Sequence, residues 1–176
     1  MAPRAVTDRT TVAALAADAP AGARIPVEVR VRVDDPFAAY RRARDGAGGA
    51  YLATTGGQPG WGYFGVNPID WLTVHPDDGD ALAALDDRLA DETLVRGDCD
   101  VPYPAGAVGW LSYDLARELE ALPDETRRDR DLPRLQVALY DTLAAWEEPR
   151  GDGATTLRIT ACPRVGSGAD EDVFDR

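Results

Sequence analysis

The stretch PYPAGAVGWLSYDLARELE, residues 102–120, sets the organisation of the chain. Its prolines restrict the backbone, whereas Gly106 and Gly109 allow close approach of a neighbouring segment or unusual dihedral angles. The small apolar residues 105–111 are typical of a strand that is buried on both faces. The stretch therefore begins with a turn and a buried strand.

An amphipathic helix is predicted to follow this strand. Ser112 or Asp114 can cap it, because a short oxygen-bearing side chain accepts hydrogen bonds from the free amides of the first turn. Leu115 and Leu119 are four residues apart and are expected to share the buried face. The charged residues expected to face water are Arg117, Glu118 and Glu120.

Downstream, Leu132 and Pro133 precede an apolar run that ends in Tyr140 and Asp141. The two stretches together resemble the N-terminal domain of the chorismate-utilising synthases, anthranilate synthase component I and para-aminobenzoate (aminodeoxychorismate) synthase component I. The family pattern is Gly-Gly-x-x-Gly-aromatic-x-x-Tyr-Asp-x-x-Arg-x-x-Glu, followed by a Leu-Pro pair and a strand ending in Tyr-Asp. The positions that match it, assigned here as structural motif residues, are Gly106, Gly109, Tyr113, Asp114, Arg117, Tyr140 and Asp141.

The charge of the chain is strongly negative. Its 31 acidic residues outnumber 19 basic ones, for a net charge of −12, and all the basic residues are arginine. Such a surface repels polyanions, so we expect no binding to nucleic acid or to an anionic membrane. An acidic surface without lysine is typical of adaptation to high salt, where cations screen the self-repulsion. A GC-rich genome explains the missing lysine, but it does not explain why 23 of the acids are aspartate.

The chain is predicted to be cytoplasmic. Cys99 and Cys162 are too few and too far apart for a zinc site or a disulfide framework, and reduced thiols are the simpler interpretation. The N-terminus lacks the long apolar run of a signal peptide or a membrane-spanning helix.

The predicted fold class is α+β, with antiparallel strands in a meander and a hairpin that form a β-sandwich-like sheet with flanking helices. Residues 1–24 are expected to form a loosely ordered arm, 25–162 the folded domain, and 163–176 a polar linker. The expected strands are 25–33, 50–54, 61–66, 71–74, 135–146 and 155–161, of which 50–74 form the meander and the last two the hairpin. The expected helices are 36–44, with Asp34 or Asp35 as its cap, and 77–91.

The meander is the candidate ligand site. Hydroxyls at Thr54 and Thr55 and aromatic walls from Trp61 and Tyr63, around a glycine-rich turn, could hold a small amphipathic molecule. An aromatic hairpin that merely packs is the alternative. In anthranilate synthases the resemblance implies a tryptophan feedback pocket here, centred on the serine of a Leu-Leu-Glu-Ser segment. This chain has a threonine at the serine position and no glutamate, which favours the para-aminobenzoate branch.

Catalytic chemistry is not expected within the chain. His75 is the only histidine, no phosphate-binding loop is present, and the aspartate pairs that start helices have a structural explanation, so we assign no metal or cofactor. The resemblance implies that catalysis and magnesium binding belong to a C-terminal chorismate-binding domain, with ammonia supplied by a glutamine amidotransferase subunit.

The resemblance thus implies the N-terminal domain of an aminodeoxychorismate synthase component I, which aminates chorismate to 4-amino-4-deoxychorismate for folate-type cofactors. Anthranilate synthase component I, in tryptophan biosynthesis, is the close alternative. A stand-alone ligand-binding or scaffold module without catalysis is the third.

Overall fold

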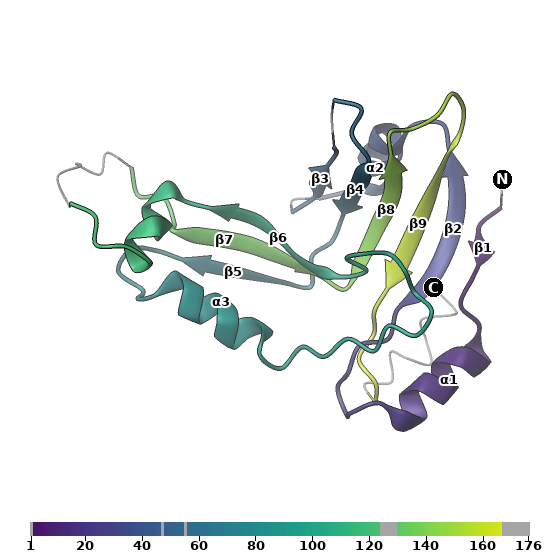
Figure 1. The fold of residues 1–176 in the computed structure, drawn as a ribbon, viewed down its shortest axis with the longest axis horizontal. Helices are drawn as coiled ribbons and strands as arrows, with labels where there is room; N and C mark the ends of the chain where they lie inside the picture. The colour runs from purple at the N-terminus through teal and green to yellow at the C-terminus, as the bar shows by residue number, and fades with distance from the viewer. Residues whose placement is uncertain (1, 47, 55, 124–129, 167–176) are drawn as a thin grey trace.

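The strands form two antiparallel sheets that diverge from a shared junction (Figure 1). The computed structural model describes residues 2–46, 48–54, 56–123 and 130–166. The larger sheet has the strand order β1-β2-β9-β8-β4-β3, and the smaller one, the arm sheet, has the order β5-β7-β6. This arrangement of strands and flanking helices confirms the α+β class. No described helix has the length and apolar character needed to cross a membrane.

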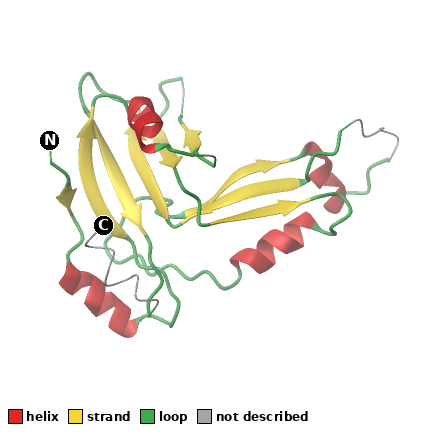
Figure 2. Ribbon diagram, turned by 180° about the vertical axis from the view of Figure 1, so that it is seen from behind, coloured by secondary structure: helices red, strands yellow, loops and turns green. Residues whose placement is uncertain are grey.

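The larger sheet is built from both ends of the chain. Its strands are β1 (Arg4–Ala5), β2 (Val27–Val33), β3 (Ala50–Leu52), β4 (Gly60–Gly65), β8 (Thr142–Glu148) and β9 (Thr155–Ala161). Helix α2 (Pro36–Ala43) lies across one face, where Tyr40 packs with Phe64, Trp146 and Leu157 (Figure 2). Asp35 caps α2 as expected, because its carboxylate accepts from the amides of Phe37 and Ala38.

The arm sheet contains β5 (Asp70–Val74), β6 (Gly106–Leu111) and β7 (Leu135–Tyr140). Helix α3 (Ala81–Leu89) covers one face, and its Ala81 packs with Val74, Leu135 and Val137. The predicted three-strand meander is therefore wrong: β3 pairs with β4, but β5 pairs with β7 in the other sheet. Short apolar strands look alike in sequence, so pattern alone does not assign them to sheets.

The predicted long strand 135–146 is also two strands in two sheets. The chain leaves β7 at Tyr140, passes through Asp141 and enters β8 at Thr142. Tyr140 pairs with Gly106 in the arm sheet, whereas Thr142 pairs with Ala161 in the larger sheet. Both halves are buried, so the apolar pattern continues across the junction and conceals it.

Strand β6 is not buried on both faces, contrary to the prediction. Among the described strands it pairs only with β7, at the edge of the arm sheet, and Leu111 at its end is 53% exposed. Its small residues offer little surface to bury, and the apolar cluster under α3 is formed by other residues of the arm. Gly109 nevertheless has a packing role, because a Cβ there would lie 2.0 Å from the carbonyl oxygen of Gln136 on β7.

The helix predicted after β6 is a short 3₁₀ helix, η1 (Tyr113–Glu118), and Ser112 makes no side-chain cap. Leu115 is buried, but Leu119 is 71% exposed because the 3₁₀ helix has ended and the two leucines no longer share a face. Glu118 is turned inward to the first amides of α3, so its predicted exposure to water is also wrong.

The N-terminal residues contact the larger sheet. Strand β1 pairs with β2, and helix α1 (Arg9–Asp18), capped by Asp8, packs its buried Val12 against Ile25 and Val27. These contacts hold residues 4–18 more closely than expected for a loosely ordered arm. Most of the predicted linker, 167–176, lies outside the described residues.

Candidate functional site

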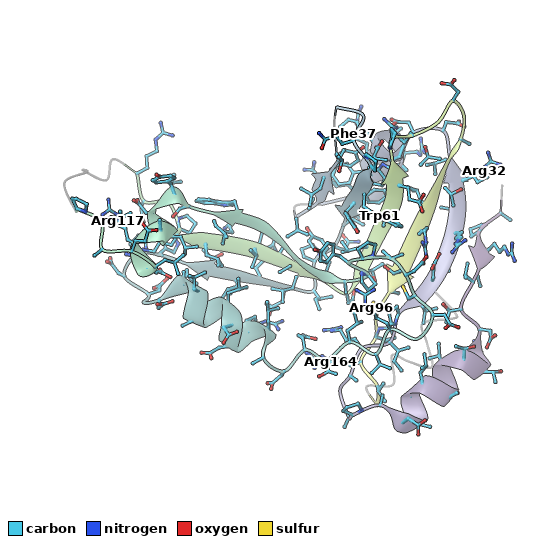
Figure 3. The ribbon with its side chains drawn as sticks, in the orientation of Figure 1. Arg32, Phe37, Trp61, Arg96, Arg117 and Arg164 are labelled. Carbon is cyan, nitrogen blue, oxygen red and sulfur yellow. The ribbon has the colours of Figure 1, made fainter. Side chains whose placement is uncertain are left out.

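The face of the larger sheet opposite α2 carries aromatic and charged side chains. Alternation along strands brings Tyr63, Arg158 and Arg30 into one row across β4, β8, β9 and β2, with Ala145 between the first two. Trp61 lies two residues from Tyr63 on the same strand and therefore on the same face. Figure 3 shows Trp61 over the larger sheet and Arg32 beside β2. The β-ladders therefore gather residues from four separate segments.

The structure brings Trp61 and Tyr63 together, with ring centroids 6.4 Å apart. Tyr103 meets the Tyr63 ring edge-on at 6.0 Å, and the Arg158 guanidinium lies 5.6 Å from the centroid of the Trp61 ring. The Thr54 hydroxyl donates to the carbonyl oxygen of Trp61 at 3.2 Å, so it supports the β4 backbone. Thr55 lies outside the described residues.

The hydroxyl of Tyr63 is buried beside the Tyr103 backbone, without a hydrogen bond of good geometry. Burial raises the pKa of Tyr63 above its ordinary value, so the ring stays neutral at physiological pH. The two aromatic rings thus form a neutral wall next to a cationic guanidinium.

A buried ion pair lies in the middle of this face. Arg158 donates from Nε and Nη2 to the Glu28 carboxylate at 2.8 and 2.7 Å, and it also donates to Asp100. Burial alone would raise the pKa of Glu28, but hydrogen bonds from Arg158 and Arg30 outweigh it and lower the pKa. Hydrogen bonds to Glu28 and Asp100 raise the pKa of Arg158, so the pair remains charged.

Residues 96–104 cross this face and cover the ion pair. The Thr160 hydroxyl donates to the carbonyl oxygen of Pro104 at 2.6 Å, and Val101 is fully buried. Arg96 fixes the bend of the segment, since its Nη1 donates to the carbonyl oxygen of Val101 at 2.7 Å. The face of β2 that carries Glu28 is therefore partly covered, and only 3% of Glu28 is exposed.

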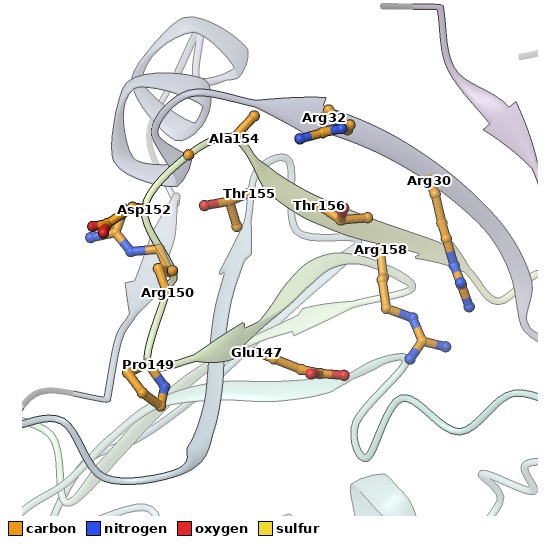
Figure 4. A pocket seen from close by; sticks show the side chains of 12 residues that line it. Arg30, Arg32, Glu147, Pro149, Arg150, Asp152, Ala154, Thr155, Thr156 and Arg158 are labelled. Atoms are coloured by element: carbon orange, nitrogen blue, oxygen red, sulfur yellow. The ribbon is translucent and has the colours of Figure 1, made fainter.

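A groove of about 470 Å³ opens on the same face, beside the turn between β8 and β9 (Figure 4). We call it the arginine groove. It was not predicted from the sequence, although Arg158 in the middle of the apolar strand β9 indicates that this strand faces charged partners. Its side-chain lining includes Arg30, Arg32, Glu147, Arg150, Asp152, Thr155, Thr156 and Arg158.

The two family-like stretches are neighbouring strands. Gly106 of the first pairs with Tyr140 of the second, so β6 and β7 form one antiparallel unit. The buried Tyr140 hydroxyl donates to the carbonyl oxygen of Gly48, and the Asp141 carbonyl oxygen accepts from the Cys162 amide at 2.8 Å. These two residues therefore hold the junction of the sheets.

The remaining motif residues lie at the far end of the arm. Asp114 accepts from Arg117 Nε at 3.1 Å, and Arg117 Nη1 donates to the carbonyl oxygen of Pro123 at 2.8 Å. Tyr113 is 92% exposed, and Figure 3 shows Arg117 at that end of the molecule. They are thus remote from the aromatic and arginine face.

A second, more apolar groove of about 840 Å³ lies on the α2 face of the larger sheet, near the junction. Val29, Val31, Ile159 and Ala161 supply its floor, and Asp141 contributes to its border. These strand residues are only partly buried in the described chain, so the sheet offers unoccupied apolar surface.

Comparison with known proteins relates this geometry to a class. No family model matches the chain. The chain is 70% identical, over 90% of its length, to anthranilate synthase component 1 1 of Haloarcula marismortui, and covers 32% of that protein. It is 53% identical over 97% of its length to anthranilate synthase component 1 3 of the same organism, covering 35% of it. Aminodeoxychorismate synthase component 1 of Salmonella typhimurium is 48% identical, over 25% of this chain and 10% of that protein.

These similarities are to component I of the chorismate-utilising synthases, the class that the motifs implied. Within it, the long matches are to anthranilate synthases, so the preference for the para-aminobenzoate branch is not confirmed. The chain spans about a third of the length of the two Haloarcula relatives. Their source also supports the interpretation of the acidic composition as adaptation to salt.

Proposed function

We propose that the chain is the N-terminal domain of component I of an anthranilate synthase. The observation that carries this proposal is the 70% identity over 90% of the chain to an anthranilate synthase component 1. The complete enzyme would convert chorismate and ammonia to anthranilate with loss of pyruvate. Anthranilate synthase is thus preferred here over the para-aminobenzoate branch, which the absence of the glutamate in the meander segment had favoured.

The catalytic residues are proposed to lie outside this chain, in a C-terminal chorismate-binding domain. Within the described ranges no three His, Cys, Asp or Glu side chains are grouped so as to hold a metal ion. We propose that the magnesium ion binds in that other domain, as the family resemblance implies. A glutamine amidotransferase subunit would supply the ammonia, in keeping with the designation of the relatives as a component 1.

The apolar groove near Asp141 supports a partner domain. It has the size and lining of a docking surface, and the partly buried Val29 and Ile159 side chains lose their remaining contact with water when a second domain covers them. The exposed edge strand β6 offers unpaired backbone groups to the same kind of partner. The alternative of a stand-alone module requires this surface to stay uncovered.

Aminodeoxychorismate synthase is the second candidate, favoured by the 48% identity over 44 residues to the Salmonella protein. In that case ammonia would replace the 4-hydroxyl of chorismate and the ring would keep its enolpyruvyl group. The two candidates therefore differ in their products.

The test is complementation. The chain would be produced together with the remaining two-thirds of the 70%-identical Haloarcula relative, in high salt, and assayed with chorismate, ammonium and Mg²⁺. We expect the two pieces to co-purify and to release fluorescent anthranilate. Release of 4-amino-4-deoxychorismate would support the second candidate, and failure to associate would favour the stand-alone module.

A pair of variants would locate the docking surface. Thr142→Arg places a bulky charge in the apolar groove, at an exposed position where the fold tolerates it. Thr73→Arg places the same charge on the exposed outer face of β5. We expect only the first variant to weaken co-purification, and equal effects would argue against docking at the groove.

A further inference from the structure

The arginine groove has the opposite charge balance to the rest of the chain. Overall, acids outnumber arginines by 31 to 19. The groove is instead lined by four arginines, from β2, β9 and the β8–β9 turn, and by two acids, Glu147 and Asp152 (Figure 4). The protein has a net charge of −12, but a groove rich in arginine has a locally positive potential that attracts anions.

Three of these arginines pair with carboxylates, and Arg30 does so through Nε alone. Arg158 is paired with Glu28 and Asp100, and Arg150 Nη1 donates to Asp35 at 3.0 Å. These ion pairs neutralise much of the charge of the arginines. They also fix the positions of the side chains that form the walls of the groove. The attraction for an anion therefore rests mainly on Arg32 and on the outer nitrogens of Arg30.

Arg30 and Arg32 are two residues apart on β2 and so point to the same face. Arg30 uses Nε to donate to Glu28 at 2.6 Å, and its outer nitrogens have no partner in the part of the chain that the structure describes. Arg32 makes no hydrogen bond or ion pair with another described residue, and it is exposed at the groove. Both guanidinium groups thus have donors to offer.

We propose that the arginine groove binds a small anion bearing a carboxylate or phosphate group, held by Arg30 and Arg32. Guanidinium groups bind these anions through paired N–H donors, and the hydroxyl of Thr156, which pairs with Arg32 on the same face, adds a neutral donor. The volume of about 470 Å³ suits a small molecule. The proposal concerns this chain alone and does not depend on the synthase function.

The test is a titration of the ¹⁵N-labelled chain with inorganic phosphate and, separately, with succinate, at constant ionic strength set by potassium chloride. Amide shifts of Thr155, Thr156 and Arg32 would be followed. We expect saturable shifts with a Kd of about 1 mM, because the groove is open to water and the charges are partly screened. The ligand with the lower Kd identifies the preferred anionic group.

Arg32→Gln should weaken binding about fivefold or more, because it removes a charge-assisted donor pair. Arg42→Gln, on the exposed side of α2, removes the same charge away from the groove and should leave the Kd unchanged. Far-UV circular dichroism would verify the fold of both variants. Shifts that do not saturate, or an equal loss in the two variants, would overturn the proposal.

Discussion

Glu118 and Ala81 are joined across the arm by a hydrogen bond of 3.0 Å, from the first amide of α3 to the carboxylate of η1. The Leu82 amide donates to the same oxygen at 3.0 Å, and Arg134 donates to the other oxygen at 3.2 Å. The N-terminus of α3 is thereby capped from a segment more than thirty residues downstream. A carboxylate at this end of a helix is favoured by the free amides and by the helix dipole.

Replacing Glu118 by alanine should destabilise the chain by about 2 kcal/mol, because the buried amides and Arg134 lose their common acceptor. Glu120→Ala, at an exposed position nearby, should change the free energy of unfolding by no more than about 0.5 kcal/mol. Urea unfolding of both variants measures the difference. Similar values would show that the cap contributes little.

Gly109→Ala should destabilise the arm by about 2 kcal/mol or more, because its Cβ would meet the Gln136 carbonyl at 2.0 Å and β6 would have to move off β7. Gly151→Ala is the matched control, since nothing lies within 4 Å of its Cβ position. Thermal unfolding would compare the two. An unchanged midpoint for Gly109→Ala would show that the two strands separate without cost.

Acid should destabilise the chain in part through Glu28. Its pKa is lowered in the folded state from the ordinary 4.5, so its contribution is present above pH 4.5 and is lost as the pH falls through the folded value. Between about pH 6 and about pH 3 the wild type should therefore lose more stability than Glu28→Gln, which lacks this titration. Parallel pH profiles of the two proteins would contradict the assignment.

Salt should stabilise the chain. The net charge of −12 repels itself at low ionic strength, and screening removes that repulsion. We expect the unfolding midpoint to rise between about 0.1 M and about 1 M potassium chloride, where the Debye length falls from about 10 Å to about 3 Å. A midpoint that is constant or falls over this range would count against adaptation to salt.

Tryptophan binding would test the ligand site predicted at Thr54, Trp61 and Tyr63. If the chain carries a feedback pocket, calorimetric titration should detect tryptophan binding that Trp61→Ala abolishes. Trp71→Ala, at a half-exposed ring on the arm, should bind as the wild type does. Binding that survives Trp61→Ala would remove the pocket from this position.

The local elements were predictable from the sequence because their signals are local. The alternation of valines gave β2, and Asp35 before Pro36 gave the start of α2. The paired motif stretches were recognised without the knowledge that Gly106 and Tyr140 are direct partners. Each of these features depends on residues that lie a few positions apart.

Features that depend on distant segments were not predictable. The alternation of β2 does not show that residues 96–104 return to cover Glu28, which pairs with Arg158. The arginine groove needs β2 and β9 side by side, a pairing between residues more than a hundred positions apart. Periodicity shows which face a residue occupies, but it does not show what will lie against that face.

The pairing of β4 with β8 makes the whole arm an insertion within a hairpin. Phe64 pairs with Ala144, so the chain leaves the larger sheet after Gly65 and returns at Thr142 beside its point of departure. A short turn could join these two positions and preserve the register of every strand that remains. The shortened protein would lose residues 96–104, however, and the pair of Glu28 and Arg158 would then face water. The arm can thus be removed without changing the connections of the larger sheet, but the larger sheet needs residues of the arm to shield its buried ion pair from water.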